Sequence, residues 1–326
     1  MYSEPLKSIW KVLLISYVLC LSACQLGGAG QGHAAGVSLQ EFRFHDGQSA
    51  ISLALRKPAS GTVENLLFVI PGSDCISMYP LLPDYFRGLE GQAGATQIYI
   101  LHKRQIHPFS RGSYCGAAFT EADHLQQWLA DQREFIQQKI ALHRQQVESP
   151  KRIVLLGISE GAETATMLAK ELPFSHLVLL SHSGKAPLQV YRQLAQTSPK
   201  MAQAWQSLSQ ALYQDPASAP ELMHGRSMRY WRELLDLPQT ATLLNLTIPV
   251  LIAAGGHDPV LPADTAEFLS ELNQESRGRI QIFWFQRADH GLFHPDHAYL
   301  PDFMYLMEKW WMAGQSGFDH GFFSLE

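Results

Sequence analysis

The chain has 326 residues, of which 46% are hydrophobic, and its formal net charge is −5. This apolar fraction is typical of a globular protein with a sizeable core, which excludes a disordered or fibrous chain. The charges form no long basic run, so we expect no nucleic-acid partner.

The N-terminus has the pattern of a secretory signal. Lys7 and Lys11 precede an apolar run over residues 12–20, which is too short to span a bilayer as a stable helix and is followed by small residues. The sequence Leu-Ser-Ala-Cys that ends the segment resembles the lipobox of bacterial lipoproteins. This resemblance implies a signal peptide over residues 1–23 and lipidation of Cys24. An ordinary signal, cleaved or uncleaved, is the alternative.

The lipobox resemblance also implies a location. In such lipoproteins a residue other than Asp after the lipidated cysteine, here Gln25, implies the outer membrane. Residues 24–36 are rich in Gly and Ala and are expected to form a flexible tether. We therefore expect a domain over residues 37–326 that faces the periplasm and is held at the membrane by its N-terminal lipid.

Four cysteines occur in the chain, and two remain once Cys20 is removed with the signal and Cys24 is lipidated. In an oxidising compartment the remaining pair, Cys75 and Cys115, is expected to form a disulfide. Two free buried thiols are the alternative.

The first half of the domain alternates predicted strands with loops and helices. Residues 37–45 and 51–56 alternate apolar and polar residues around Asp46-Gly47, which predicts an antiparallel hairpin at a sheet edge. Residues 65–70 form an apolar run typical of a buried parallel strand and end at Pro-Gly-Ser-Asp. A helix is expected over residues 81–89 and a strand over residues 97–101.

A long loop follows over residues 102–116 and contains Lys103, Arg104, His107 and Arg111. Loops of this length in compact domains are usually functional or mobile. The cations are either solvated or directed at a substrate. The next helix is expected over residues 122–143, where apolar residues recur at helical spacing.

The centre of the sequence is the stretch over residues 152–168, in which an apolar run breaks into Gly-Ile-Ser-Glu-Gly and then into a helical pattern. Such a strand, turn and helix holds the serine in a strained backbone region with its hydroxyl exposed. Helix N-terminal N–H groups also face any negative charge that develops beside it. Ser159 is therefore the candidate nucleophile, and a serine at an ordinary turn or helix cap is the alternative.

The second half predicts a strand over residues 175–180 and then a helical insertion over about residues 185–244. The aromatic residues of the insertion are expected in its core rather than at a ligand, and they include Trp205, Tyr213, Tyr230 and Trp231. A strand over residues 249–254, a helix over 263–272, a strand over 280–285 and a final helix over 302–311 complete the pattern. The alternation predicts an α/β fold with a mainly parallel sheet covered on both faces.

A serine nucleophile needs a base, and the base needs an acid that orients it. Asp258 follows the strand over residues 249–254, and His290 follows the strand over residues 280–285. Loops after parallel strands open on the same sheet edge, where Ser159 also lies. The rival acids are Asp264 and Asp289, and the rival bases are His257, His294 and His297.

The elbow, the acid turn over residues 256–260 and the histidine loop over residues 289–291 together resemble the α/β-hydrolase superfamily, over nearly the whole mature chain. The resemblance implies a serine hydrolase with a helical cap. It also implies an oxyanion hole formed by the backbone N–H of Glu160 and one near Ser73. Because Pro-Gly-Ser departs from the family's common His-Gly start, either Ser73 or Asp74 could be the second donor.

Glu160 is unusual as an acid beside an oxyanion site. We expect it to be a helix N-terminal acid stabilised by the dipole rather than a substrate contact. No His-x-x-x-His pair lies on a helical pattern with a supporting carboxylate, so neither a metal nor a cofactor is expected.

These features predict a serine hydrolase that attacks an ester, thioester or amide carbonyl of a small-molecule acyl substrate, and an esterase is preferred. A peptidase is the enzymatic alternative, because the fold does not specify the leaving group. A catalytically silent envelope binding or scaffold protein is the alternative from another class.

Overall fold

The computed structural model describes residues 36–58, 60–112, 115–145, 150–214, 221–313 and 321–326. The expected signal peptide, Cys24 and all of the tether except Gly36 lie outside the described residues. Among the described helices, none combines the length and the apolar composition that a bilayer crossing requires.

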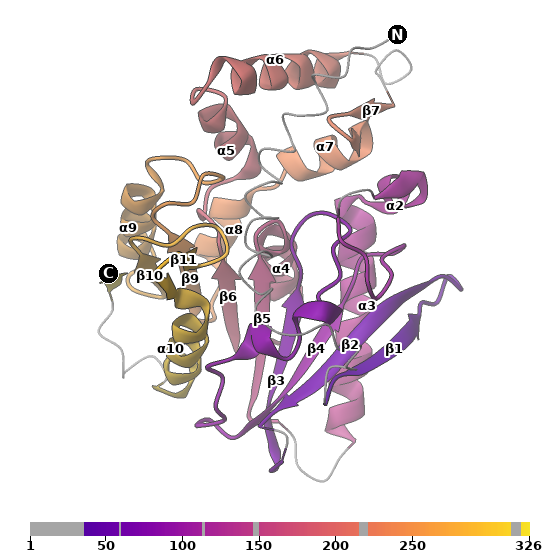
Figure 1. The fold of residues 1–326 in the computed structure, drawn as a ribbon, viewed down its shortest axis with the longest axis vertical. Coiled ribbons are helices and arrows are strands. Elements are labelled where there is room, and N and C mark those ends of the chain that lie inside the picture. Colours follow the sequence, from indigo (N-terminus) through magenta and orange to yellow (C-terminus); the bar gives the residue numbers. More distant parts are fainter. Residues whose placement is uncertain (1–35, 59, 113–114, 146–149, 215–220, 314–320) are drawn as a thin grey trace.

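Nine strands form one sheet in the order β1-β2-β4-β3-β5-β6-β9-β10-β13 (Figure 1). Only β1 with β2 and β2 with β4 pair antiparallel, and every other neighbouring pair is parallel. The strands are β1 (Ser38–Arg43), β2 (Ser49–Lys57), β3 (Val63–Ile70), β4 (Ala95–Leu101), β5 (Arg152–Ile158), β6 (His176–Leu180), β9 (Val250–Gly255), β10 (Ile280–Phe285) and β13 (Phe322–Leu325). The mainly parallel α/β fold with an antiparallel hairpin at one edge is thus confirmed.

Both faces of the sheet are covered because the central strands are apolar along most of their length, on both faces. In β5, Leu155 belongs to one core cluster, whereas Val154 and Leu156 belong to the cluster on the opposite face. Apolar side chains of α3 (Leu125–Arg144), α4 (Gly161–Glu171), α8 (Gln239–Asn245) and α9 (Thr265–Glu275) complete the first cluster. Those of α10 (Tyr299–Ala313) complete the second.

The segment between β6 and β9 contains most of the structure that lies outside the sheet layers. It comprises α5 (Pro187–Leu194), α6 (Pro199–Tyr213), α7 (Met228–Leu235), α8 and the two-residue strands β7 (Leu222–Met223) and β8 (Arg226–Ser227). Figure 1 shows α5, α6 and α7 gathered at one end of the molecule, beyond the sheet. We call the described part of residues 187–235 the cap. The next helix, α8, packs on α4 instead, and Gln239 Nε2 donates to Thr166 Oγ1 at 2.8 Å.

The cap aromatics mostly pack as expected. Tyr230 and Trp231 are buried, and Trp205 packs partly buried against the main core cluster. Tyr213 at the end of α6 is exposed, so for this residue the expectation of a core position was wrong. The short β7–β8 hairpin was also not predicted, because two-residue strands leave no periodic signal.

The structure differs from the sequence-based expectation in three places. Residues 81–89 form no α-helix; one 3₁₀ turn, Tyr79–Leu81, ends where the helix was expected to begin, and a second, Asp84–Phe86, lies within the range. Pro83 holds Leu82 in an extended conformation, which interrupts any longer helix. The helix expected over residues 122–143 is two helices, α2 (Gly116–Ala122) and α3, and the His124 side chain caps α3 by accepting from the Gln127 N–H. The fold also does not end with α10, because β13 adds a parallel strand beside β10.

Candidate active site

Ser159 lies directly after β5, in the centre of the parallel sheet. Its φ is +52°, a left-handed value that non-glycine residues rarely adopt. The Ser159 N–H donates to Leu180 O at 2.8 Å, and Ser159 O accepts from the Ala162 N–H at 2.8 Å. These bonds fix the turn between the strand and α4, so the serine side chain stands at the carboxyl edge of the sheet.

Two glycines of this turn allow the backbone to approach its neighbours closely. A Cβ on Gly157 would lie 2.6 Å from Ala162 Cα, inside the first turn of α4. A Cβ on Gly161 would lie 2.3 Å from the carbonyl oxygens of both Ile70 and Pro71. Both distances are too short for any side chain, so the close contact between β5, α4 and the end of β3 requires glycine at both positions.

The three candidate catalytic side chains lie within hydrogen-bond distance of one another. His290 Nε2 is 3.0 Å from Ser159 Oγ, and His290 Nδ1 is 2.6 Å from Asp258 Oδ2. The Asp258 carboxylate is fully buried, whereas 13% of the His290 side chain is exposed. The three side chains Ser159, His290 and Asp258 therefore have the contacts that proton transfer from the serine hydroxyl requires.

The loops that contain Asp258 and His290 are joined through their backbones. Gly255 and Gly256 pack against the carbonyl groups of residues 286–289 so closely that a Cβ on either would come within 2.3 Å of an oxygen. The His257 N–H donates to Ala288 O at 2.9 Å. From β6, Ser181 Oγ donates to His290 O at 2.6 Å. The imidazole is thus positioned by main chain from three neighbouring strand ends.

The rival acids and bases have other partners. Asp264 accepts from Lys185 Nζ at 2.6 Å, and Asp289 accepts from the backbone N–H groups of Gly291 and Phe293. His257 is exposed. His294 lies against Arg287, and His297 lies 2.5 Å from Asp302, both away from Ser159.

The Asp258 carboxylate changes the titration of His290. Burial by itself lowers the pKa of the imidazole, but the charge of Asp258 and its hydrogen bond raise the pKa by more, and the net pKa is above 6.5. The protonated imidazole is thus stabilised in the folded protein. A base that accepts the serine proton gains from this stabilisation in the transition state.

The turn after β3 lies beside the nucleophile. A Cβ on Gly72 would lie 3.4 Å from Ser159 Cβ, so the backbone of the turn at Gly72 lies against the serine. Within the described part of the chain, the backbone N–H groups of Glu160, Ser73 and Asp74 donate to no backbone acceptor. They remain free for a ligand oxygen, which is what the sequence-based oxyanion-hole expectation requires.

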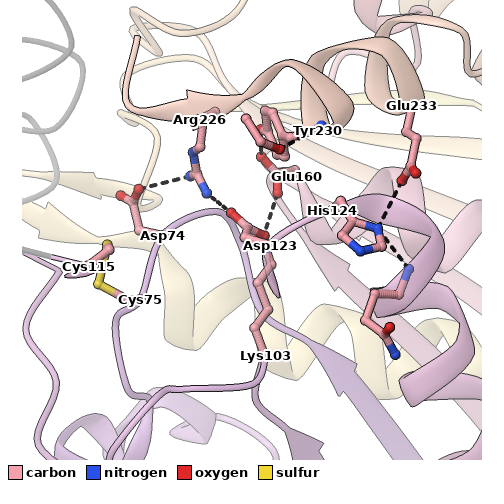
Figure 2. A network of polar contacts seen from close by, with 12 residues as sticks. Asp74, Cys75, Lys103, Cys115, Asp123, His124, Glu160, Arg226, Tyr230 and Glu233 are labelled. Atoms are coloured by element: carbon pink, nitrogen blue, oxygen red, sulfur yellow. Dashed lines mark hydrogen bonds and ion pairs between the residues drawn. A yellow bond between two sulfur atoms is a disulfide. The ribbon is translucent and has the colours of Figure 1, made fainter. Parts of the chain in front are cut away.

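Glu160 is held by side chains rather than by the helix N-terminus alone. Its Oε1 accepts from Lys103 Nζ at 2.8 Å, and its Oε2 accepts from the Tyr230 hydroxyl of the cap (Figure 2). The expectation of an acid stabilised only by the helix dipole was therefore incomplete. Burial raises the pKa of the Tyr230 hydroxyl well above its ordinary value, and the charge of Glu160 raises it further.

The cations of the loop over residues 102–116 differ from each other. Lys103 is only 6% exposed and pairs with Asp123 at 2.8 Å as well as with Glu160. Arg104 forms two hydrogen bonds of 2.8 Å with Asp131. Lys103 and Arg104 are thus buried ion-pair partners, neither solvated nor free for a substrate, whereas His107 and Arg111 are exposed. The signal that could have revealed Lys103 is its position immediately after a buried strand.

Cys75 and Cys115 form a disulfide that links the turn after β3 to the N-cap of α2. Of the two alternatives that the sequence left open, the structure therefore contains the bond. In the parts of the chain that the structure describes, no group of three or more His, Cys, Asp or Glu side chains is arranged to hold a metal ion.

Solved structures with a similar fold are known, although their sequence identity to this chain is low. A search of curated protein sequences gives no match. Est1E from Butyrivibrio proteoclasticus has a TM-score of 0.57 at 15% identity, with 86% of this chain and 99% of that chain covered. An esterase domain from a Rhodothermus marinus protein has a TM-score of 0.50 at 15% identity, with 84% and 97% covered. At such identities the likeness concerns the fold alone.

The acylaminoacyl peptidase of Pyrococcus horikoshii has a TM-score of 0.55 at 13% identity. The alignment covers 88% of this chain but only 43% of that peptidase, so the chain spans less than half of its length. The sequence model of the alpha/beta hydrolase family matches residues 67–300, which is more than half of the chain. The protein therefore belongs to the α/β-hydrolase family.

Proposed function

We propose that the protein is a serine hydrolase that cleaves a carboxylic ester through an acyl-enzyme intermediate. The observation that supports this most strongly is the continuous contact from Ser159 through His290 to the buried Asp258. Membership of a hydrolase family supports the general reaction. The free backbone N–H groups beside the serine support acyl transfer in particular.

The proposed reaction has two halves. Ser159 Oγ attacks the carbonyl carbon while His290 Nε2 takes the hydroxyl proton, and Asp258 orients the imidazole and stabilises its charged form. The tetrahedral oxyanion is bound by the N–H of Glu160 and one from Ser73 or Asp74. The C–O bond to the leaving alcohol then breaks, and His290 returns the proton to that alcohol. In the second half, water attacks the acyl-enzyme carbonyl while His290 takes its proton. The bond to Ser159 Oγ then breaks, His290 returns the proton to Ser159, and the acid is released.

The nature of the leaving group is a separate question. The similar structures include esterases, a lipase, an acylaminoacyl peptidase and an isopeptidase. An ester is preferred because Est1E and the Rhodothermus marinus esterase domain match this chain over nearly their whole length. The chain covers less than half of the acylaminoacyl peptidase and of the isopeptidase. A peptidase is the second candidate for the same triad, and a silent binding protein is the third.

We also propose that the enzyme acts in the bacterial envelope, lipid-anchored at Cys24 and facing the periplasm. The lipobox-like sequence supports the anchor. The disulfide between Cys75 and Cys115 supports an oxidising compartment.

The experiment is labelling of the purified protein with a fluorophosphonate, which reacts only with an activated serine. Wild type is expected to label, Ser159→Ala to show no labelling, and His290→Ala to label at least about 10⁴-fold more slowly. Ser207→Ala, which removes an exposed cap serine, is the control and should label as wild type does. Unlabelled but folded wild type would overturn the proposal. Rates on p-nitrophenyl esters and on N-acyl anilides then separate an esterase from a peptidase.

A further inference from the structure

Six side chains beside the nucleophile form one connected group, which we call the charge network (Figure 2). They are Asp74, Lys103, Asp123, Glu160, Arg226 and Tyr230. Three are carboxylates and two are cations, and all of them are largely buried. The proposed reaction does not use any of these side chains directly, so their arrangement needs a separate explanation.

Two of the carboxylates lie next to the proposed oxyanion donors. Glu160 provides one of these donors from its own backbone, and its side chain is bound by Lys103 Nζ at 2.8 Å. Asp74 follows Ser73 and has a left-handed φ of +72°. Its carboxylate accepts from Arg226 Nη2 at 3.1 Å. Each cation thus holds the side chain of a residue whose backbone lies at the site.

Asp123 connects the two cations. One carboxylate oxygen lies 2.8 Å from Lys103 Nζ and the other contacts the Arg226 guanidinium. The path from Asp74 to Glu160 therefore runs through Arg226, Asp123 and Lys103 without a break. Because a buried charge without its partner is strongly destabilising, the five groups hold their positions together.

The network also joins the cap to the sheet. Arg226 is the first residue of β8 and Tyr230 lies on α7. Their partners Asp74, Asp123 and Glu160 lie in the loop after β3, before α3 and after β5. The Arg226 guanidinium stacks 4.8 Å from the Tyr230 ring centre. A displaced cap would withdraw Arg226 from both of its carboxylates at once.

We propose that Lys103 and Arg226 are positioning residues for the oxyanion hole. Because Arg226 belongs to the cap, the hole has its catalytic geometry only when the cap is packed against the sheet. The inference rests on the proposed hydrolase function. Backbone donors must be aimed to within a fraction of an ångström, and a misplacement of about 1 Å can cost about 10² in rate. The Lys103 cation also compensates the charge of the Glu160 carboxylate, which would otherwise repel the developing oxyanion, and the Tyr230 hydroxyl donates to the same carboxylate.

The test compares an ester with its thionoester, p-nitrophenyl acetate and p-nitrophenyl thionoacetate. Sulfur is a weak hydrogen-bond acceptor, so the thionoester gains little from the oxyanion donors. Asp74→Asn and Arg226→Gln should each lower kcat on the ester by about tenfold or more. This loss is smaller than the loss of about 10²–10³ that follows removal of an oxyanion donor. The rate on the thionoester should change little. Arg229→Gln removes a cap cation that is 62% exposed and should leave the rate ratio unchanged.

The variants are chosen so that the result is decisive. If Arg226→Gln does not fold, Asp74→Asn decides, because this side chain is 20% exposed and Arg226 keeps its pair with Asp123. Arg226→Lys should restore only part of the ratio, since one ammonium group cannot bridge two carboxylates as the guanidinium does. An equal loss on both substrates, or no loss, in folded Asp74→Asn overturns the inference. Wild type that hydrolyses neither substrate and takes up no fluorophosphonate overturns the proposed function and this inference together.

Discussion

The two sides of the site are held in different ways. Ser159, Asp258 and His290 lie on turns that are fixed by main-chain hydrogen bonds and by glycines packed against carbonyl groups. The cap side packs through apolar residues such as Trp231 and Leu234 on the main core cluster, and its polar attachments are ion pairs and hydrogen bonds between long side chains, through Arg226 and Glu233. Main-chain contacts between strand ends have one arrangement, whereas side-chain pairs can separate and form again. We therefore expect the catalytic side to be the more rigid of the two.

The largest effect is expected where the rigid side is disturbed. Gly161→Ala would place a Cβ 2.3 Å from two backbone oxygens, which cannot move without shifting the end of β3. We expect the free energy of unfolding to fall by about 3 kcal/mol. Urea denaturation would measure the change.

The control for this prediction is Gly225→Ala in the cap. That position has a positive φ, +79°, which Gly161 does not have, and nothing lies within 4 Å of an added Cβ. Its cost should therefore be only the conformational term of about 1 kcal/mol. Equal losses for the two variants would contradict the view that close backbone packing fixes the catalytic side.

The second effect is on the pH dependence of the rate. His290 must be neutral to accept the serine proton. Burial lowers its pKa, but the charge and hydrogen bond of Asp258, together with the charge of Asp289, raise the pKa above 6.5. Below that raised pKa, kcat/KM should fall tenfold per pH unit. The measurement is the pH profile of kcat/KM on a p-nitrophenyl ester. A wild-type limb centred at or below 6.5 would contradict the assignment.

Asp258→Asn provides the matched comparison. Without the carboxylate charge, burial dominates, so the acidic limb should move to lower pH while kcat falls by about 10⁴. The same pKa shift affects stability. Because the folded-state pKa is raised, the Asp258 interaction with the charged imidazole stabilises the fold fully below about pH 6.5. That contribution is lost as the pH rises through the raised pKa.

The smallest effect is expected on the cap side. Glu233 accepts from the Gln126 N–H at the start of α3 at 2.8 Å and lies 3.3 Å from His124 Nδ1. Glu233→Gln should weaken this attachment by about 1 kcal/mol. Amide hydrogen exchange in α7 should then speed up by about fivefold, with that in α4 unchanged. Equal acceleration in both helices would mean that the cap and the sheet unfold as one unit.

The sequence by itself determined the sheet and the order of the site residues. Continuous apolar runs can only be buried on both faces, and Gly-Ile-Ser-Glu-Gly after such a run leaves one conformation for the turn. Because parallel strands all end at one edge, the loops after β9 and β10 had to come near Ser159. The assignment of Asp258 rather than Asp264 or Asp289 rested on that placement and on the resemblance of residues 256–260 to the acid turn of the family.

The tertiary structure decided what depends on contacts between distant segments. The pairing of Lys103 with Glu160, and of Arg226 with Asp74, joins residues 57 and 152 positions apart, which no periodicity encodes. The choice between solvated and buried cations likewise depended on which carboxylates the fold brought beside them. Strand β13 was missed because a four-residue segment carries too little pattern, and only the open edge of β10 makes it a strand. Local patterns specify elements, whereas charge pairing across the cap is specified only once the elements have packed.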